Sequence, residues 1–273
     1  MKKHLPNILL ILIFFIGLSL LLYPTVSDYW NSLHQSRAIA DYAEKVANIN
    51  NDEYDEIWAS AKIYNEKLAQ KGNSWVLSEA ELEEYNNQLN ISTSGVMGYI
   101  EIPSIDCSLP IYHGVDESVL QVAVGHIEGS SLPIGGLGTH AVLSGHRGLP
   151  SAKLFTNLDK MVEGDIFIIR ILDETLTYEV DNISIVLPNE LDNIKIEQDK
   201  DLCTLVTCTP YGVNTHRLLV RGHRIENQES EVAVRVTSDA IQIDPIIIAP
   251  IVAIPMLIIL LILLLVESSK KKR

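Results

Sequence analysis

Cys208 is the residue of this sequence best placed to act as a nucleophile. In residues 202–208 alternate side chains fall on the same face of an extended strand, and Thr209–Gly212 ends that strand in a turn. A thiol at the end of a rigid strand can reach a bound substrate, and its thiolate is a strong nucleophile. A strand-end cysteine on its own is more often a small buried apolar residue, so further groups are needed.

Arg217 begins the next strand-like run, residues 216–223, after a loop long enough for a hairpin. If the two strands pair, Arg217 and Cys208 come to the same rim of the sheet. A guanidinium there would favour the thiolate and stabilise a developing oxyanion. The alternative for an isolated arginine is a surface ion pair.

His146 lies in a glycine-rich turn, residues 144–148, that follows another strand-like run. The glycines allow a sharp turn and leave the imidazole accessible. An imidazole in this position can exchange protons with a leaving amine, which acyl transfer by a cysteine requires. Alone, such a histidine would be an ordinary polar loop residue.

The elements that must position these residues are short strands preceded by helices. Residues 28 to about 70 have a helical pattern that can break near residues 50–52, and Ser78 with Glu81 forms the signature of a capping box. Seven β-type runs separated by turn residues predict a mainly β fold, an antiparallel barrel. The runs are residues 99–102, 108–112, 140–144, 166–171, 176–186, 202–208 and 216–224.

Both ends of the chain contain a run long and apolar enough to cross a bilayer as a helix, residues 5–26 and 245–266. The first run has no convincing signal-peptidase site, which favours an uncleaved anchor. Basic residues flank both runs on their outer sides, at Lys2, Lys3 and in the tail 267–273, so both termini are predicted to be cytoplasmic. The domain between the two membrane helices is then extracellular.

The whole chain carries a net charge of −14, and several of its basic residues lie at the two ends, outside the predicted extracellular part. The extracellular part is therefore even more acidic than the whole chain. This charge argues against nucleic acid as a partner. The chain has three cysteines, an odd number, so at least one thiol is free. Cys203 and Cys208 are an odd number of positions apart, which places them on opposite faces of a strand and disfavours a disulfide between them.

Taken together, these segments resemble the sortase family. Residues 204–208 read TLVTC and match its TLxTC signature, Arg217 follows nine positions after Cys208, and residues 144–148 match the segment of the catalytic histidine. The resemblance extends from residue 95 to residue 217. Within the family, the sequence looks like class C, the pilin-polymerising branch. It implies a catalytic eight-stranded barrel over residues 95–226, after a helical stalk and lid region at 28–94 and before a linker at 227–244.

The resemblance also implies a membrane-bound transpeptidase without a cofactor. Cys208 would cleave an LPxTG-like sorting signal between Thr and Gly through a thioester, His146 would protonate the leaving amine, and Arg217 would hold the substrate and oxyanion. A lysine of another pilin subunit would then release the acyl chain. Thr207 is a candidate for substrate binding. Trp75 lies in roughly the region of the class C lid, where it would either plug the groove or simply pack against a helix. The Asp-Pro-aromatic motif of that lid is missing, so the lid mechanism is not carried over.

Three alternatives stay open. A housekeeping or accessory sortase would use the same residues but attach surface proteins to a cell-wall amine. A hydrolytic cysteine peptidase or a catalytically inactive membrane scaffold is also compatible with the architecture. The acidic residues between 190 and 201 fit no calcium-loop template, and a solvated acidic loop is the preferred interpretation, so no metal is predicted.

Overall fold

The computed structural model describes residues 5–72, 75–91 and 95–227, with four isolated positions in the C-terminal segment. The chain divides into two compact units, residues 1–30 with 231–273, and residues 31–230. Among the described residues one helix, Asn7–Asn48, is long and apolar enough to cross a membrane. The predicted linker, second membrane helix and basic tail lie almost entirely outside the described residues.

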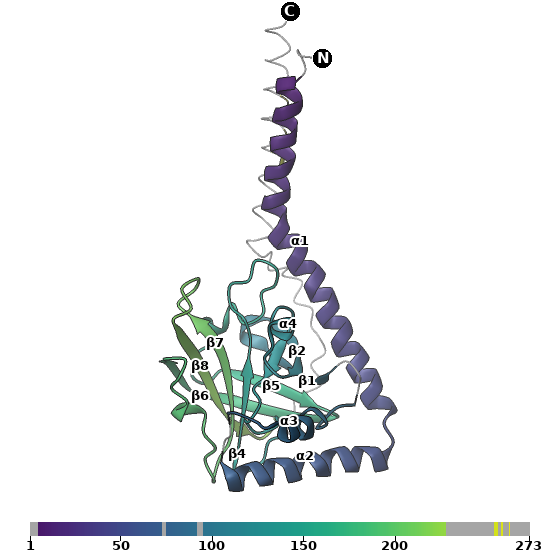
Figure 1. Ribbon diagram of the computed structural model, residues 1–273, viewed down its shortest axis with the longest axis vertical. Coiled ribbons are helices and arrows are strands. Elements are labelled where there is room, and N and C mark those ends of the chain that lie inside the picture. The colour runs from purple at the N-terminus through teal and green to yellow at the C-terminus, as the bar shows by residue number, and fades with distance from the viewer. Residues whose placement is uncertain are drawn as a thin grey trace, which may run out of the picture. The chain divides into compact units, whose positions relative to one another are not determined.

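Three helices precede the barrel: α1 (Leu5–Asn48), α2 (Asn51–Lys71) and α3 (Glu79–Asn86) (Figure 1). The predicted break between the first two is confirmed, because the Asn50 side chain caps α2 by accepting a hydrogen bond from the backbone N–H of Glu53. The predicted capping box of α3 is also confirmed, since Ser78 and Glu81 make the reciprocal hydrogen bonds. These caps satisfy N–H groups that a helix start would otherwise leave unpaired.

Eight strands form a closed barrel in the order β1-β2-β3-β4-β7-β8-β6-β5 (Figure 1). The strands are β1 (Val96–Ile102), β2 (Cys107–His113), β3 (Val124–His126), β4 (Thr139–Ser144), β5 (Ile166–Ile171), β6 (Glu174–Val186), β7 (Asp201–Thr209) and β8 (His216–Ile225). The connections include the short helices η1 (Pro103–Ile105), α4 (Glu117–Leu120), η2 (Leu158–Lys160) and η3 (Asp192–Ile194). The mainly β prediction is confirmed.

The prediction of a purely antiparallel barrel is wrong, because two of its strand pairs are parallel. β2 pairs with β3 and β4 pairs with β7 in parallel. A parallel pair requires a connection that crosses over, and here α4 lies in the first connection and the β5–β6 hairpin in the second. The strand β3, with three residues, is also absent from the predicted set.

The barrel interior is filled by alternate residues of each strand, and the helices close its outside. Along β5, Phe167, Ile169 and Ile171 are fully buried. Tyr42 of α1 connects helix and barrel, because its hydroxyl donates to the Met97 carbonyl (2.9 Å) and accepts from the Leu172 N–H (2.7 Å). Burial of each large apolar side chain contributes about 1.5–3 kcal/mol, so most of the stability resides in this core.

His126 of β3 is a fully buried histidine in a polar network of the barrel wall. Its Nε2 lies 2.8 Å from the Ser131 carbonyl and therefore carries the proton, whereas Nδ1 lies 2.9 Å from the Tyr85 hydroxyl and accepts. The Tyr85 hydroxyl also accepts the Gly114 N–H at 3.0 Å. Burial lowers the pKa of His126 to about 4, so the imidazole is neutral in the folded protein at neutral pH.

This buried histidine makes the barrel sensitive to acid. Above about pH 6.5 the imidazole is neutral in both folded and unfolded chains. Below that pH the unfolded chain binds a proton that the folded chain refuses until about pH 4, so this residue removes about 3 kcal/mol of stability over that interval. Urea unfolding of the detergent-solubilised chain at pH 7 and pH 4.5 measures the loss. The His126→Gln variant should lose less stability between the two pH values, and an equal loss would contradict the assignment.

Candidate active site

β7 and β8 place Cys208 and Arg217 directly opposite each other. The two strands are antiparallel, and their register pairs Cys208 with Arg217 and Val206 with Leu219. Side chains of directly opposed residues start about 4.5–5.5 Å apart at Cβ. The predicted arrangement, with both residues at one rim of the sheet, is confirmed.

His146 reaches the same rim because β4 runs parallel to β7. Ser144, the last residue of β4, pairs with Val206. The alignment continues one step further, since the Gly145 N–H donates to the Val206 carbonyl (3.0 Å) and the Thr207 hydroxyl donates to the Gly145 carbonyl (2.7 Å). The next residue on the β4 side is His146, and the corresponding residue of β7 is Cys208.

The glycines of the His146 turn are required by close contacts. A Cβ on Gly145 would lie 2.7 Å from the Phe155 ring, and one on Gly148 would lie 2.7 Å from the Tyr211 ring. Gly148 also has φ of +77°, a conformation that side-chain-bearing residues rarely adopt. The backbone of His146 is fixed by its carbonyl, which accepts the Phe155 N–H at 3.1 Å. The turn is therefore rigid around the imidazole.

The charged groups of the site are held by the residues around them. Arg217 Nη1 donates to the carbonyls of Asn214 (3.3 Å) and His216 (3.1 Å), which orients the guanidinium along the β7–β8 loop. The His146 Nε2 lies 3.4 Å from Oε2 of Glu117 in α4. Sequence reasoning missed Glu117, because no residue near it in the sequence indicates that it lies beside a histidine 29 positions away.

The other two cysteines are unsuited to nucleophilic chemistry. Burial raises the pKa of the Cys107 thiol to about 12 and that of the Cys203 thiol well above its ordinary value. Both thiols therefore stay protonated at neutral pH. Cys203 points into the barrel core, whereas Cys208 is partly exposed at the strand end, as the alternation along β7 predicts. All three cysteines are free.

Arg147 connects the His146 turn to the loop after Cys208. Its guanidinium pairs with Asp159 at 2.5 Å and lies 5.9 Å from the centre of the Tyr211 ring. Arg147 Nη1 also donates a long hydrogen bond of 3.5 Å to the hydroxyl oxygen of Thr209, the last residue of β7. Arg147 thus fixes the distance between the two loops that carry the site, and sequence reasoning did not single it out.

A second apolar cluster lies on the sheet face that leads to this rim. We call it the outer apolar cluster, and its buried members are Val142, Val186, Ile194, Val206 and Leu219. Trp75 packs against this cluster and is half-buried, together with Ile127 and Leu191. Trp75 also lines a pocket with Lys195, Ile196 and Gln198 of the β6–β7 loop, and its part as a lid stays a prediction.

Thr207, which was assigned to substrate binding, is almost completely buried. Its hydroxyl is used in the hydrogen bond to the Gly145 carbonyl, which holds the His146 turn against β7. The structure thus gives Thr207 a part in aligning the site. Its contact with a substrate stays a prediction.

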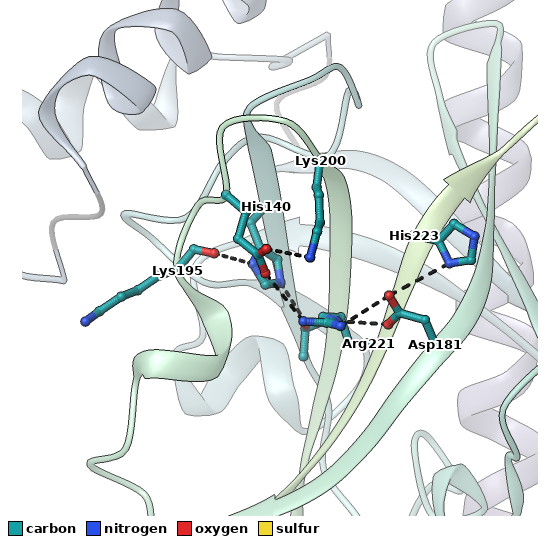
Figure 2. A network of polar contacts seen from close by, with 8 residues as sticks. His140, Asp181, Lys195, Lys200, Arg221 and His223 are labelled. Atoms are coloured by element: carbon teal, nitrogen blue, oxygen red, sulfur yellow. Dashed lines mark hydrogen bonds and ion pairs between the residues drawn. The ribbon is translucent and has the colours of Figure 1, made fainter.

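The β6–β7 loop beside the outer apolar cluster is held by a polar network (Figure 2). His140 Nδ1 donates to the Lys195 carbonyl (2.7 Å), while its Nε2 accepts from the Thr204 hydroxyl (2.7 Å). Arg221 joins this loop to the barrel, because it contacts Asp181 at 2.9 Å and Glu197 at 3.5 Å. Burial lowers the pKa of His140, which keeps the imidazole neutral and able to accept from Thr204.

The acidic residues of this loop have other uses than metal binding. Glu197 pairs with Lys200 at 2.6 Å as well as with Arg221, and Asp192 pairs with Lys195 at 2.5 Å. Among the described residues no group of three histidine, cysteine or acidic side chains is arranged to hold a metal ion.

Comparison with known proteins agrees with the geometry. The sortase domain model matches residues 100–225. Sortase C1 from Streptococcus agalactiae is 54% identical with a TM-score of 0.69, covering 70% of this chain and 100% of that one. Sortase C from Clostridium perfringens, solved with the C-terminal cell wall sorting motif, is 45% identical with a TM-score of 0.63, covering 70% and 100%.

A curated relative is more distant. Sortase D of Bacillus subtilis is 30% identical over 136 residues, which are 49% of this chain and 66% of that protein, so the chain spans somewhat less than two thirds of its length.

The arrangement of Cys208, His146 and Arg217 on a closed eight-stranded barrel, and the extent of these matches, lead to one conclusion. This chain belongs to the sortase family of cysteine transpeptidases, and most of its closely matching structural neighbours are class C sortases.

Proposed function

We propose that this protein is a membrane-anchored class C sortase that joins pilin-like surface proteins through an isopeptide bond. The observation that supports this most strongly is the convergence of Cys208, His146 and Arg217 on one rim, through the pairing of β7 with both β4 and β8. A nucleophile, a proton carrier and an oxyanion donor are the three groups that acyl transfer by a thiol requires.

In the first half-reaction the Cys208 thiolate attacks the carbonyl between Thr and Gly of an LPxTG-like sorting signal. The negative charge that develops on the carbonyl oxygen faces the Arg217 guanidinium. As the C–N bond breaks, the protonated His146 gives its proton to the leaving glycine nitrogen. The products are the amino-terminal part of the substrate held as a thioester on Cys208, a released carboxy-terminal fragment that begins with Gly and carries a free amine, and a neutral imidazole.

In the second half-reaction the neutral amine of an acceptor lysine attacks the thioester. The tetrahedral intermediate expels the Cys208 thiolate, and the proton of the attacking nitrogen passes to His146. This restores the thiolate and imidazolium of the starting state, so that the cycle consumes no cofactor. The acceptor lysine belongs, in this proposal, to another pilin subunit.

The membrane arrangement follows from the two ends of the sequence. We propose that the apolar part of α1 is an uncleaved anchor, and that residues 245–266 form a second membrane helix. The basic residues at both ends keep the termini in the cytoplasm. The barrel then works at the outer surface, where sorting signals of exported proteins are presented.

Trp75 is proposed to act as a lid over the groove formed by the outer apolar cluster. An aromatic side chain that is packed by apolar contacts alone can be displaced by a substrate with apolar residues of its own. While it is in place, water and substrate have less access to the sheet face next to Cys208. Limited water access also favours an acyl-enzyme that survives until an amine arrives.

The proposed reaction is tested with the full chain in detergent micelles, a peptide containing LPxTG, and a lysine-bearing peptide as acceptor. We expect an amide-linked product that forms only when the acceptor is present, and none with Cys208→Ala. Cys107→Ala is the matched control and should keep activity, because that thiol stays protonated. Hydrolysis at the same rate with and without any amine would instead indicate a peptidase.

The acceptor distinguishes the two kinds of sortase. Transfer to the lysine peptide, with none to a cell-wall-type oligoglycine amine, supports pilin polymerisation. The reverse preference would support the housekeeping or accessory role.

Replacement of Arg217 by lysine keeps the positive charge but removes the planar set of donors. We expect kcat/KM for transfer to fall about 100- to 1,000-fold, the usual loss when one oxyanion donor is removed. Arg170→Lys is the control, since Arg170 pairs with Glu101 at 3.0 Å on β1 and β5, away from this rim. Equal rates for native protein and Arg217→Lys would exclude the oxyanion role.

Replacement of Trp75 by alanine should open the groove. We expect bulky maleimides to label Cys208 several-fold faster in Trp75→Ala than in native protein, because the apolar cover is gone. Trp58→Ala serves as the control, since Trp58 stacks on Tyr54 of the same helix, α2. If labelling of Cys208 is unchanged in Trp75→Ala, the lid assignment fails.

A further inference from the structure

Only one of the two nitrogens of His146 is free to meet a substrate. Nε2 is inaccessible to solvent, and among the described residues it makes no hydrogen bond of good geometry. The charged group next to it is the Glu117 carboxylate, with Oε2 at 3.4 Å, a separation typical of an ion pair. The His146 side chain as a whole remains 26% exposed. Within the described residues Nδ1 makes no hydrogen bond and is not among the buried polar atoms without a partner, so Nδ1 is the accessible nitrogen.

Glu117 is held in place from within its own helix. Gln121 follows it by four positions and donates a hydrogen bond to Oε1, which leaves Oε2 directed at His146. The helix is closed by the Val119 and Leu120 N–H groups, which both donate to the Asp116 carbonyl (2.9 and 3.0 Å). The hydrogen bond from Gln121 and the proximity of His146 hold the pKa of Glu117 below its ordinary value. Glu117 thus presents a carboxylate at neutral pH.

The element that carries Glu117 has a fixed place beside the site. α4 leads into β3, and β3 pairs with β4, the strand that ends at Ser144, two residues before His146. Ala123, between α4 and β3, is fully buried and anchors the connection. The carboxylate and the imidazole are therefore positioned by adjacent strands of one barrel.

We propose that Glu117 is a positioning residue that holds the Nε2 side of His146, so that Nδ1 is the nitrogen that exchanges protons with the leaving and attacking amines. This inference rests on the proposed acyl transfer. A carboxylate beside one nitrogen of an imidazole fixes both the ring orientation and the tautomer, which directs the mobile proton to the other nitrogen.

The proton balance is consistent with this arrangement. In the starting imidazolium both nitrogens carry a proton, and Nε2–H faces the carboxylate. The Nδ1 proton passes to the leaving glycine nitrogen, which gives neutral His146 with its remaining proton on Nε2. The acceptor amine later returns a proton to Nδ1. Glu117 keeps its charge throughout and neither gains nor loses a proton.

The test removes the charge of Glu117 without changing its length. In Glu117→Gln we expect kcat for transfer to fall about 10-fold or more, a part of the 100- to 10,000-fold that general acid–base catalysis provides. KM should change less than twofold, since the substrate groove is untouched. Asp116→Asn removes the same charge one position earlier, from a side chain that makes no capping hydrogen bond, and should transfer like the native protein.

A double mutant separates an effect through His146 from a general loss of structure. If Glu117 acts through His146, Glu117→Gln should cause no further loss of transfer in the His146→Ala background. An additional 10-fold loss in that background, or full activity of Glu117→Gln alone, would overturn the inference while leaving the proposed function intact. Absence of transfer by the native protein would instead count against the proposed function.

The tautomer gives a readout that needs no turnover. Nitrogen-15 NMR of the chain labelled at histidine should show neutral His146 with its proton on Nε2, assigned by loss of the signal in His146→Ala. The His146 nitrogen signals should shift in Glu117→Gln and stay unchanged in Asp116→Asn. A proton on Nδ1 in the native protein would overturn the inference, whether or not the enzyme is active.

Discussion

The active site depends on the parallel pairing of β4 with β7. Without this pairing, Cys208 and Arg217 would still face each other across the β7–β8 hairpin, but no strand contact would hold His146 beside them. The pairing extends past the end of β4 through the Gly145 N–H and Val206 carbonyl (3.0 Å) and through the Thr207 hydroxyl. These two hydrogen bonds restrict the position of the turn, which suits a site where a misplacement of about 1 Å is costly to the rate.

Several neighbouring contacts hold the His146 turn and the end of β7 in this alignment. Gly145 and Gly148 allow Phe155 and Tyr211 to approach the turn closely, and Arg147 spans from the turn to the end of β7. On the other side, the His140 and Arg221 contacts hold the β6–β7 loop (Figure 2). The candidate catalytic side chains are thus carried by rigid elements, and Trp75 packs against the outer apolar cluster.

Local features of the fold could be predicted from the sequence because their causes are local. The capping box at Ser78 and the break before Asn51 depend on residues within one turn. Seven strands have enough alternating residues to be recognised, and the facing of Cys208 and Arg217 follows from a simple hairpin. The candidate residues Cys208, His146 and Arg217 were recognised through the resemblance of their segments to sortase motifs.

Features that depend on distant pairing could not be predicted. A strand of three residues, β3, has too few positions for a period to be visible, and its stability comes from β2 and β4 on either side. The direction of β7 relative to β4 is set by the intervening β5–β6 hairpin, so the local pattern wrongly suggested an antiparallel barrel. Glu117 lies 29 positions before His146, and only the folded barrel brings the two together.

The claim on which the whole account rests is that Cys208, among three free thiols, carries the acyl group. It is tested most directly by incubating the full chain with an LPxTG peptide in the absence of acceptor, quenching in acid, and locating the added mass by proteolysis and mass spectrometry. The account predicts the acyl group on the fragment that contains Cys208 and on neither of the fragments with Cys107 and Cys203. Acylation of Cys107 or Cys203, or cleavage of the peptide by a folded chain that carries alanine at position 208, would contradict it.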